Sequence, residues 1–284
     1  MRRSGDMDVS PTEYLTLACA ACQEVARRSN VDALFVKGAA AQRQFPLRSR
    51  AGSDVDVLVR PDHVCRYVDA LQQAGWVLMR ESSELDLSNH AVVLEHPVFA
   101  CTVDVHRNFP GFEADAGEVF DEMWREREPL DVAGRQCDAP SRIHHGALLI
   151  VNAARTAGSV EARQVWEGWS EQERSSARVA IAGFMGESAA ATQLPQEFQG
   201  GDTARYWQVV ADRPTGTAMW LARMWDTPTW GARLRLLRHA ALPPAQWGEP
   251  DRLNRRLRRI PTHWAKGLRQ LPAALRRMVE LRRG

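Results

Sequence analysis

Apolar and polar positions along the chain predict a mixed first half and a helical second half. Residues 11–29 and 61–74 repeat apolar side chains at helical spacing, and Gly75 ends the second of these helices. A helix between two strands, followed by antiparallel strands, indicates an α+β fold with a mixed sheet. Short apolar or alternating runs predict the strands at residues 34–36, 54–59, 76–79, 91–95 and 99–106, and a strand pair at 130–137 that turns at Ala133–Gly134.

Pro140 marks a candidate domain boundary, because helical spacing dominates the chain beyond it. At 284 residues the chain is long enough for one large or two small domains. We therefore expect a mixed-sheet domain at residues 1–139 and a mainly helical domain with a basic C-terminal segment at residues 140–284. The predicted helices of this second part lie at residues 145–156, 160–169, 173–185, 206–210 and 218–225.

The first two predicted strands carry the clearest candidate chemistry. Lys37 and Gly38 interrupt the first strand, and glycine at such a turn allows the backbone to approach a ligand closely. The second strand reads Asp-Val-Asp-Val-Leu-Val, so that Asp54 and Asp56 share one face. Two adjacent carboxylates repel each other unless a cation lies between them. A divalent metal is the expected cation, and replacing either aspartate with asparagine is expected to leave the fold intact or slightly stabilised.

A later alternating run adds a third carboxylate. Residues 101–106 read Cys-Thr-Val-Asp-Val-His, which places Asp104 and His106 on one face of a strand. If this strand neighbours the earlier one, Asp104 joins Asp54 and Asp56 in a cluster of three carboxylates that is able to hold two metal ions. Mg²⁺ is the expected metal, because it is usually bound by one or two carboxylates together with substrate phosphates.

In this order and spacing, these motifs resemble those of the uncharacterised nucleotidyltransferase family of the DNA polymerase β superfold. The resemblance covers about residues 30–110, with weaker similarity to about residue 170. It implies a nucleotidyltransferase domain that moves a nucleoside monophosphate from a nucleoside triphosphate to a hydroxyl acceptor. Its motifs are the Lys37–Gly38 turn, Arg50 four residues before Asp54, the Asp54/Asp56 pair with Val57-Leu58-Val59, and Val103-Asp104-Val105-His106.

The resemblance implies a catalytic and metal-binding role for the three aspartates. Asp54, Asp56 and Asp104 are the expected ligands of two Mg²⁺ ions, which would bridge the nucleotide phosphates. Asp104 would also help to deprotonate the acceptor hydroxyl. His106 shares the face of Asp104, so it is expected either at the substrate, touching metal or acceptor, or as a buried structural histidine.

The residues around the turn are expected to bind the nucleotide. Lys37 and Gly38 lie at a predicted strand–turn–helix junction, which suits phosphate binding. Arg50 suits either a phosphate or a pair with Asp54, and Ser53 is expected among the nucleotide contacts. The pair His144–His145 lies at a predicted helix start and is interpreted as structural.

Composition narrows the class of protein. With 44% hydrophobic and 25% charged residues, the chain can bury a sizeable core. No apolar stretch approaches the roughly 20 residues of a membrane span, and the two N-terminal arginines have no apolar stretch behind them, which argues against a signal peptide. Five cysteines, an odd number, favour reduced thiols, and we expect a cytoplasmic protein. Cys19 and Cys22 fall in an apolar helical pattern and are interpreted as buried rather than metal-binding.

The charge is distributed unevenly. Residues 231–284 carry 14 Lys and Arg against three Asp and Glu, a net charge of +11, whereas the rest of the chain carries −9. Lys37 is one of only two lysines against 35 arginines, which indicates a role that needs an ammonium group. Basic residues interleaved with aromatic ones can bind nucleic acid or an acidic peptide, although the same spacing suits core aromatics below solvated arginines.

Several functions therefore stay open. The acceptor is a small molecule, a peptide natural product, a protein or a tRNA. One alternative is a toxin-like transferase acting on tRNA, which the basic segment would serve. Another is a non-catalytic module that holds a nucleotide or a partner, and the three aspartates argue against it because such modules can lose them.

Overall fold

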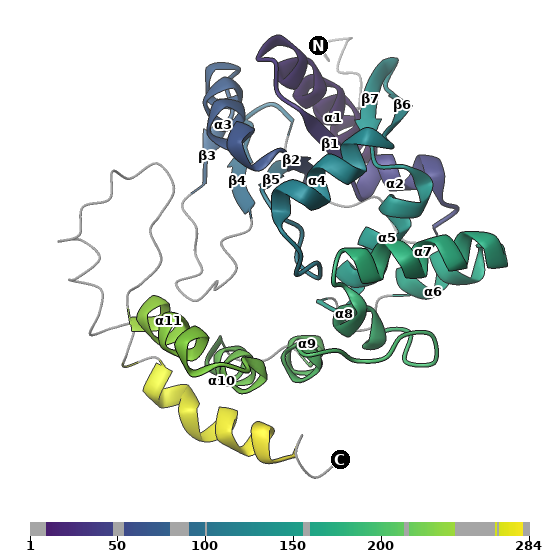
Figure 1. The fold of residues 1–284 in the computed structure, drawn as a ribbon. Helices are drawn as coiled ribbons and strands as arrows, with labels where there is room; N and C mark the ends of the chain where they lie inside the picture. The colour runs from purple at the N-terminus through teal and green to yellow at the C-terminus, as the bar shows by residue number, and fades with distance from the viewer. Residues whose placement is uncertain are drawn as a thin grey trace, which may run out of the picture. The chain divides into compact units, whose positions relative to one another are not determined.

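A sheet and a set of helices form two separate units of the chain in the computed structural model, which describes residues 10–47, 54–79, 91–99, 101–155, 160–212, 216–241, 265 and 267–280. The sheet unit comprises Met1–Met79, His90–Phe109 and Ala114–Gly146, and the helical unit comprises Arg80–Asn89, Pro110–Glu113 and Ala147–Gly284. A mixed sheet followed by many helices confirms the predicted α+β fold class (Figure 1).

A five-stranded mixed sheet organises the first unit, with its strands in the order β1-β2-β5-β4-β3. Strand β2 pairs antiparallel with β1 and parallel with β5, and β4 pairs antiparallel with both β5 and β3. Each expected strand is present, although β5 begins three residues late because residues 97–99 form a turn. The strands are β1 (Ala33–Val36), β2 (Asp54–Val59), β3 (Val77–Leu78), β4 (Ala91–Glu95) and β5 (Thr102–His106).

The helices of the sheet unit follow from local signals in the sequence. Helix α1 (Pro11–Arg28) begins with a capping box, in which the Ser10 hydroxyl accepts from the Glu13 N–H and the Glu13 carboxylate accepts from the Ser10 N–H. Helix α3 (Val64–Gln73) follows a short 3₁₀ turn, η1 (Pro61–His63), and buries the predicted apolar face. The remaining helices are α2 (Gly38–Gln44), α4 (Ala116–Arg125) and the start of α5 (Arg142–Ala153).

A hairpin of β6 (Glu128–Val132) and β7 (Arg135–Ala139) forms a second, two-stranded sheet. It turns at Ala133 and Gly134, as predicted, and their φ angles of +53° and +71° match the twist of a two-residue hairpin loop. Strand β7 packs against β1 and α1, where Cys137 is buried. Cys19 and Cys22 are buried free thiols on α1, in agreement with their helical interpretation.

The helical unit consists of the end of α5 and the helices that follow it. Residues 110–113 belong to this unit: a Cβ on Gly111, at φ +116°, would come within 2.6 Å of the Val151 side chain. Glu113 accepts two hydrogen bonds from Arg223, at 2.8 and 2.7 Å, and one from the Trp207 ring. The helices are α6 (Glu161–Glu167), α7 (Glu171–Gly183), α8 (Glu187–Ala191), α9 (Ala204–Ala211), α10 (Gly216–Asp226) and α11 (Trp230–Ala241), with a further helix at residues 267–280.

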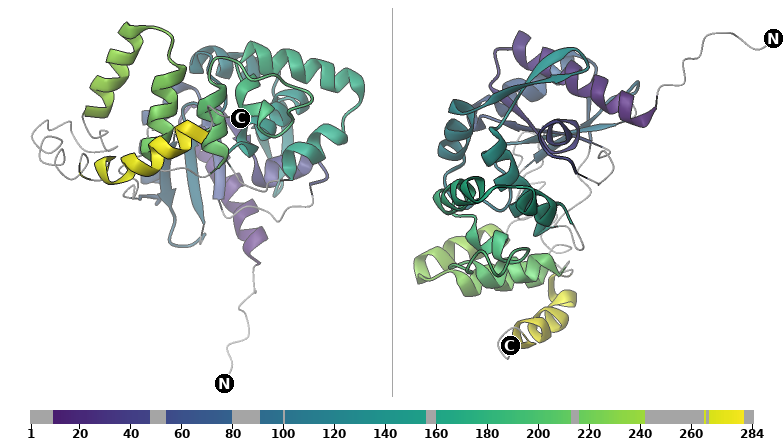
Figure 2. Two further views of the ribbon diagram at one scale, coloured as in Figure 1. Left: turned by 90° about the horizontal axis from the view of Figure 1, so that it is seen from below. Right: turned by 90° about the vertical axis from the view of Figure 1, so that its right-hand side faces the viewer.

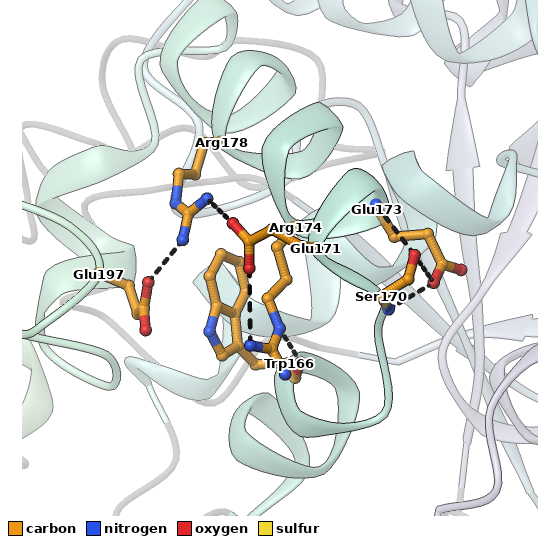
Figure 3. Close-up of polar contacts among 7 residues, drawn as sticks. All are labelled: Trp166, Ser170, Glu171, Glu173, Arg174, Arg178 and Glu197. Carbon is orange, nitrogen blue, oxygen red and sulfur yellow. Dashed lines mark hydrogen bonds and ion pairs between the residues drawn. The ribbon is translucent and has the colours of Figure 1, made fainter.

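The connection between α6 and α7 is held by charged contacts around one tryptophan (Figure 3). Ser170 caps α7 in a capping box with Glu173. Arg174 donates to the Trp166 carbonyl at 3.0 Å, and Arg178 lies 5.1 Å above the Trp166 ring while pairing with acidic groups on both sides. These contacts are local to the helical unit, so we assign them to its stability.

Part of the basic segment is packed helix. In the left view of Figure 2 the helix at residues 267–280 lies beside α10. Ala274 and Met278 are buried there in a cluster with residues of α9 and α10, and Gln270 accepts a hydrogen bond from the Thr217 hydroxyl at 2.9 Å. None of the described helices combines the length and apolar character needed to cross a membrane.

Candidate active site

The parallel pair β2/β5 brings the predicted acidic residues together. Asp56 of β2 and Asp104 of β5 are register partners, as are Leu58 and His106. Along β2 the residues alternate in direction, so Asp54 and Asp56 share a face. The expectation that the two acidic strands are neighbours is confirmed.

Asp56 lies at the centre of the site. Its Oδ1 is 2.6 Å from the Lys37 Nζ and 2.9 Å from the His106 Nε2, and the residue is only 4% exposed. Burial alone would raise the pKa of this carboxyl, but the His106 hydrogen bond and the Lys37 charge outweigh burial and lower it. Asp56 is therefore held ionised between two nitrogen groups.

The other two carboxyl groups show the opposite perturbation. Burial, followed by repulsion from Asp56, raises the pKa of Asp104 to about 6. The same two causes in the same order raise the pKa of Asp54. Three carboxyl groups thus interact electrostatically, and two of them are harder to ionise than free aspartate in the protein alone.

One group of side chains in the described part of the chain could hold a metal ion. Asp56, Asp104 and His106 each offer a ligand atom, and these atoms all lie within 4.8 Å of one another. Asp54 is not a member of this group, whereas the sequence predicted it as a ligand and His106 at the substrate. The fit to a divalent cation is good, because a cation would offset the burial and the repulsion from Asp56 that together raise the pKa values of Asp54 and Asp104.

The Lys37–Gly38 turn borders the same site. Both residues have positive φ angles, +58° and +41°, and Lys37 is the N-cap of α2. A small pocket is lined by the turn together with the start of β2, including Asp54 and Asp56. The Lys37 ammonium also lies 5.9 Å from the centre of the Phe109 ring, which in turn packs against His106.

Two predicted site residues, Arg50 and Ser53, lie outside the described residues. The structure adds two residues that the sequence did not place here. His145 and Gln44 connect α5 and α2 to the turn, because the Lys37 N–H donates to the His145 Nε2 at 3.0 Å and His145 Nδ1 is 2.5 Å from the Gln44 Oε1. A histidine at a helix start carries no sequence signal for this contact, which spans 108 residues.

Paired acidic strands beside a Lys–Gly turn define the class of a nucleotidyltransferase, as the resemblance implies. Residues 14–169 match the model of a family described as uncharacterised nucleotidyltransferase, which covers more than half of the chain. The chain therefore belongs to the uncharacterised nucleotidyltransferase family. No curated protein matches it.

A comparison with solved structures found the following similar chains, all at low sequence identity. The antibiotic-resistance factor ANT(2″)-Ia, solved with adenylyl-2″-tobramycin, is 13% identical, with a TM-score of 0.35 over 64% of this chain and 97% of that chain. The lincosamide antibiotic adenylyltransferase LnuA, solved with lincomycin, is 12% identical, with a TM-score of 0.32 over 56% and 91%. An antigenic nucleotidyltransferase-like protein from Paracoccidioides brasiliensis is 12% identical, with a TM-score of 0.39 over 68% and 96%.

Proposed function

We propose that this protein transfers a nucleoside monophosphate from a nucleoside triphosphate to a hydroxyl acceptor and releases pyrophosphate, in a reaction that depends on a divalent metal. One observation carries the proposal: Asp56 and Asp104 are register partners on adjacent strands, with the Lys37 ammonium 2.6 Å from Asp56. The family to which the chain belongs supports the reaction type.

Asp56 and Asp104, together with Asp54 on the same face of β2, would hold the metal, and we expect two Mg²⁺ ions. Bound Mg²⁺ would neutralise charge that develops around the α-phosphate of the transferred nucleoside monophosphate. His106 orients the Asp56 carboxylate through the hydrogen bond at 2.9 Å, which is the usual role of a partner behind a metal ligand. Of the two roles expected for His106, we therefore propose the structural one, in which this buried histidine supports Asp56 and does not contact the substrate.

Three residues of the chain itself, Lys37, Asp104 and Gly38, have separate roles in the proposed reaction. Lys37 lines the same pocket as Asp54 and Asp56, so its ammonium would supply a positive charge to a triphosphate bound there. Asp104 accepts the proton of the acceptor hydroxyl, and the oxygen of that hydroxyl forms the new bond to the α-phosphorus as the bond to pyrophosphate breaks. Gly38 at φ +41° keeps the turn free of a Cβ on the side that faces Asp54.

The acceptor is a hydroxyl compound of a class that the site residues do not encode. A small molecule, a peptide natural product, a protein and a tRNA remain candidates, and a toxin-like action on tRNA is the alternative that the basic segment would serve. A non-catalytic module that binds a nucleotide or a partner is the alternative outside the enzymes.

The experiment uses each of the four ribonucleoside triphosphates labelled at the α- or the γ-phosphate, with Mg²⁺ and a panel of acceptors that includes bulk tRNA and the protein itself. We expect α-label in the product and its loss in the Asp104→Asn and Asp56→Asn variants. The His144→Leu variant, altered away from the three aspartates, is the matched control and should retain transfer. Transfer of γ-label would make the protein a phosphotransferase, and nucleotide binding without any transfer would favour the binding module.

A further inference from the structure

Lys37 holds a backbone conformation that residues other than glycine avoid. Its φ and ψ angles are +58° and −163°, in a region that glycine populates almost alone. Such a conformation persists only where the surroundings fix it, and it is often found at functional sites. The residue that adopts it here is the one whose ammonium contacts Asp56.

The contact that fixes this turn comes from a distant part of the chain. The Lys37 N–H donates to the Nε2 of His145, in the first turns of α5, at 3.0 Å. The His145 side chain is completely buried, and the edge of the Phe45 ring packs against it at 5.9 Å between ring centres. The position of the imidazole is therefore set by packing, and the backbone at Lys37 must adopt the conformation that brings its N–H to the His145 Nε2.

A second set of contacts fixes which ring nitrogen of His145 carries the proton. The Gln44 amide nitrogen donates to two groups that can only accept, the Glu128 carboxylate and the Pro140 carbonyl, each at 3.0 Å. The Gln44 amide oxygen must then face His145, so Nδ1 carries the proton and donates to it. This leaves the lone pair of Nε2 to accept from the Lys37 N–H.

We propose that His145, as the neutral tautomer protonated on Nδ1, is a positioning residue that holds the Lys37–Gly38 turn in its strained conformation and so places the Lys37 ammonium on Asp56. Burial lowers the pKa of His145 to about 3, so the imidazole stays neutral around pH 7 and keeps its accepting lone pair. His145 acts through Lys37 and does not itself touch the carboxylates. Its effect on nucleotide binding rests on the function proposed above, whereas its tautomer does not.

The first experiment measures the tautomer directly. Long-range ¹H–¹⁵N correlation spectra of the full chain report which His145 nitrogen bears the proton. We expect protonation of Nδ1 alone between pH 6 and 8. Protonation of Nε2 in this range would overturn the inference, because that nitrogen could not accept from the Lys37 N–H.

The second experiment measures the affinity for the nucleoside triphosphate that the wild type binds most tightly, with Mg²⁺, by calorimetry. His145→Leu removes the acceptor and should weaken affinity by about 3- to 10-fold, the value of one hydrogen bond. His145→Gln places an amide oxygen near the former Nε2 and should stay within about 2-fold of the wild type. The matched control is His144→Leu, which removes the adjacent buried histidine and should also leave affinity unchanged.

The outcomes separate the two proposals. Equal losses in His145→Leu and His144→Leu, or no recovery in a folded His145→Gln variant, would show that His145 is only a core residue. Should the wild type bind none of the four nucleoside triphosphates, the proposed function fails, and the tautomer measurement alone decides the inference about His145. Circular dichroism and the thermal midpoint of each variant report whether it has folded.

Discussion

Replacing Asp104 with asparagine should stabilise the metal-free protein at neutral pH while abolishing nucleotidyl transfer. The folded protein raises the pKa of Asp104 from its ordinary value of 3.8 to about 6, chiefly through burial and secondly through repulsion from Asp56. Each pH unit of such a difference corresponds to about 1.4 kcal/mol, so the ionised carboxylate opposes folding by up to about 3 kcal/mol. Because the side chain remains partly exposed and solvent screens its charge, we expect about 1–2 kcal/mol.

The sign of the pH dependence makes the prediction specific. Below about pH 4 Asp104 is protonated in both the folded and the unfolded chain, so the wild type and Asp104→Asn should be equally stable. Between pH 4 and 6 the folded chain retains a proton that the unfolded chain loses, and the wild type loses stability relative to the variant. Above pH 6 the full difference of about 1–2 kcal/mol should remain.

The assay is urea unfolding of both proteins in chelator at pH 4, 5, 6 and 7.5, followed by the same series with Mg²⁺. In Mg²⁺ the wild type should gain stability and the variant should gain less, because binding to the folded state alone stabilises it. A variant that is less stable than the wild type at pH 7.5, by the same amount as at pH 4, would show that the Asp104 carboxylate has a structural role and that the repulsion argument is wrong.

Three further predictions follow from the geometry. Asp56→Asn should destabilise the protein by about 1–3 kcal/mol in thermal unfolding, because it leaves Lys37 without its carboxylate; unchanged or higher stability would restore the simpler repulsion argument. Lys37→Ala and Lys37→Gly should both bind the nucleotide more weakly in calorimetry, and Lys37→Gly should be about 1–3 kcal/mol more stable than Lys37→Ala, since glycine adopts the Lys37 angles without strain. Equal stabilities of the two variants would show that the backbone at position 37 is not strained. The double variant Arg269→Glu/Arg276→Glu reverses two exposed charges on the helix at residues 267–280, so it should lower turnover only with a polyanionic acceptor and make that turnover depend less steeply on salt. Unchanged turnover and salt dependence on tRNA would show that these arginines only form a solvated face.

Much of the sheet unit could be predicted because its signals are local. Helix α1, the apolar face of α3 and the Ala133–Gly134 turn each depend on residues that are close together in sequence, and all appear where the pattern places them. The common face of Asp54 and Asp56 follows from the period of a strand. That β2 and β5 are neighbours was the one long-range assumption, and the register of Asp56 with Asp104 confirms it.

The detailed contacts of the site depend on distances that no local pattern encodes. The sequence predicts the same role for Asp54 and Asp56, whereas in the structure their pKa values shift in opposite directions, because Asp56 contacts both Lys37 and His106. His145 could not be placed for the same reason, since its partners Lys37 and Gln44, at the two ends of α2, lie 108 and 101 residues away in sequence. Hydrogen bonds between distant side chains are set by packing of the whole unit.

The lysine at position 37 is unusual both for the composition of this arginine-rich chain and for the backbone conformation that the residue adopts. A glycine would hold the turn at φ +58° and ψ −163° without strain, and the chain uses arginine for 35 of its 37 basic residues, yet lysine occupies this position. An arginine would satisfy the composition, but its planar guanidinium is larger than the ammonium that lies 2.6 Å from the buried Asp56 Oδ1 and beside the Phe109 ring. The strain at this turn and the rare lysine are both explained if a compact positive charge must lie between Asp56 and an anionic ligand. We therefore propose that the backbone strain at Lys37 is tolerated because it places the ammonium beside Asp56, where it can also contact an anionic ligand.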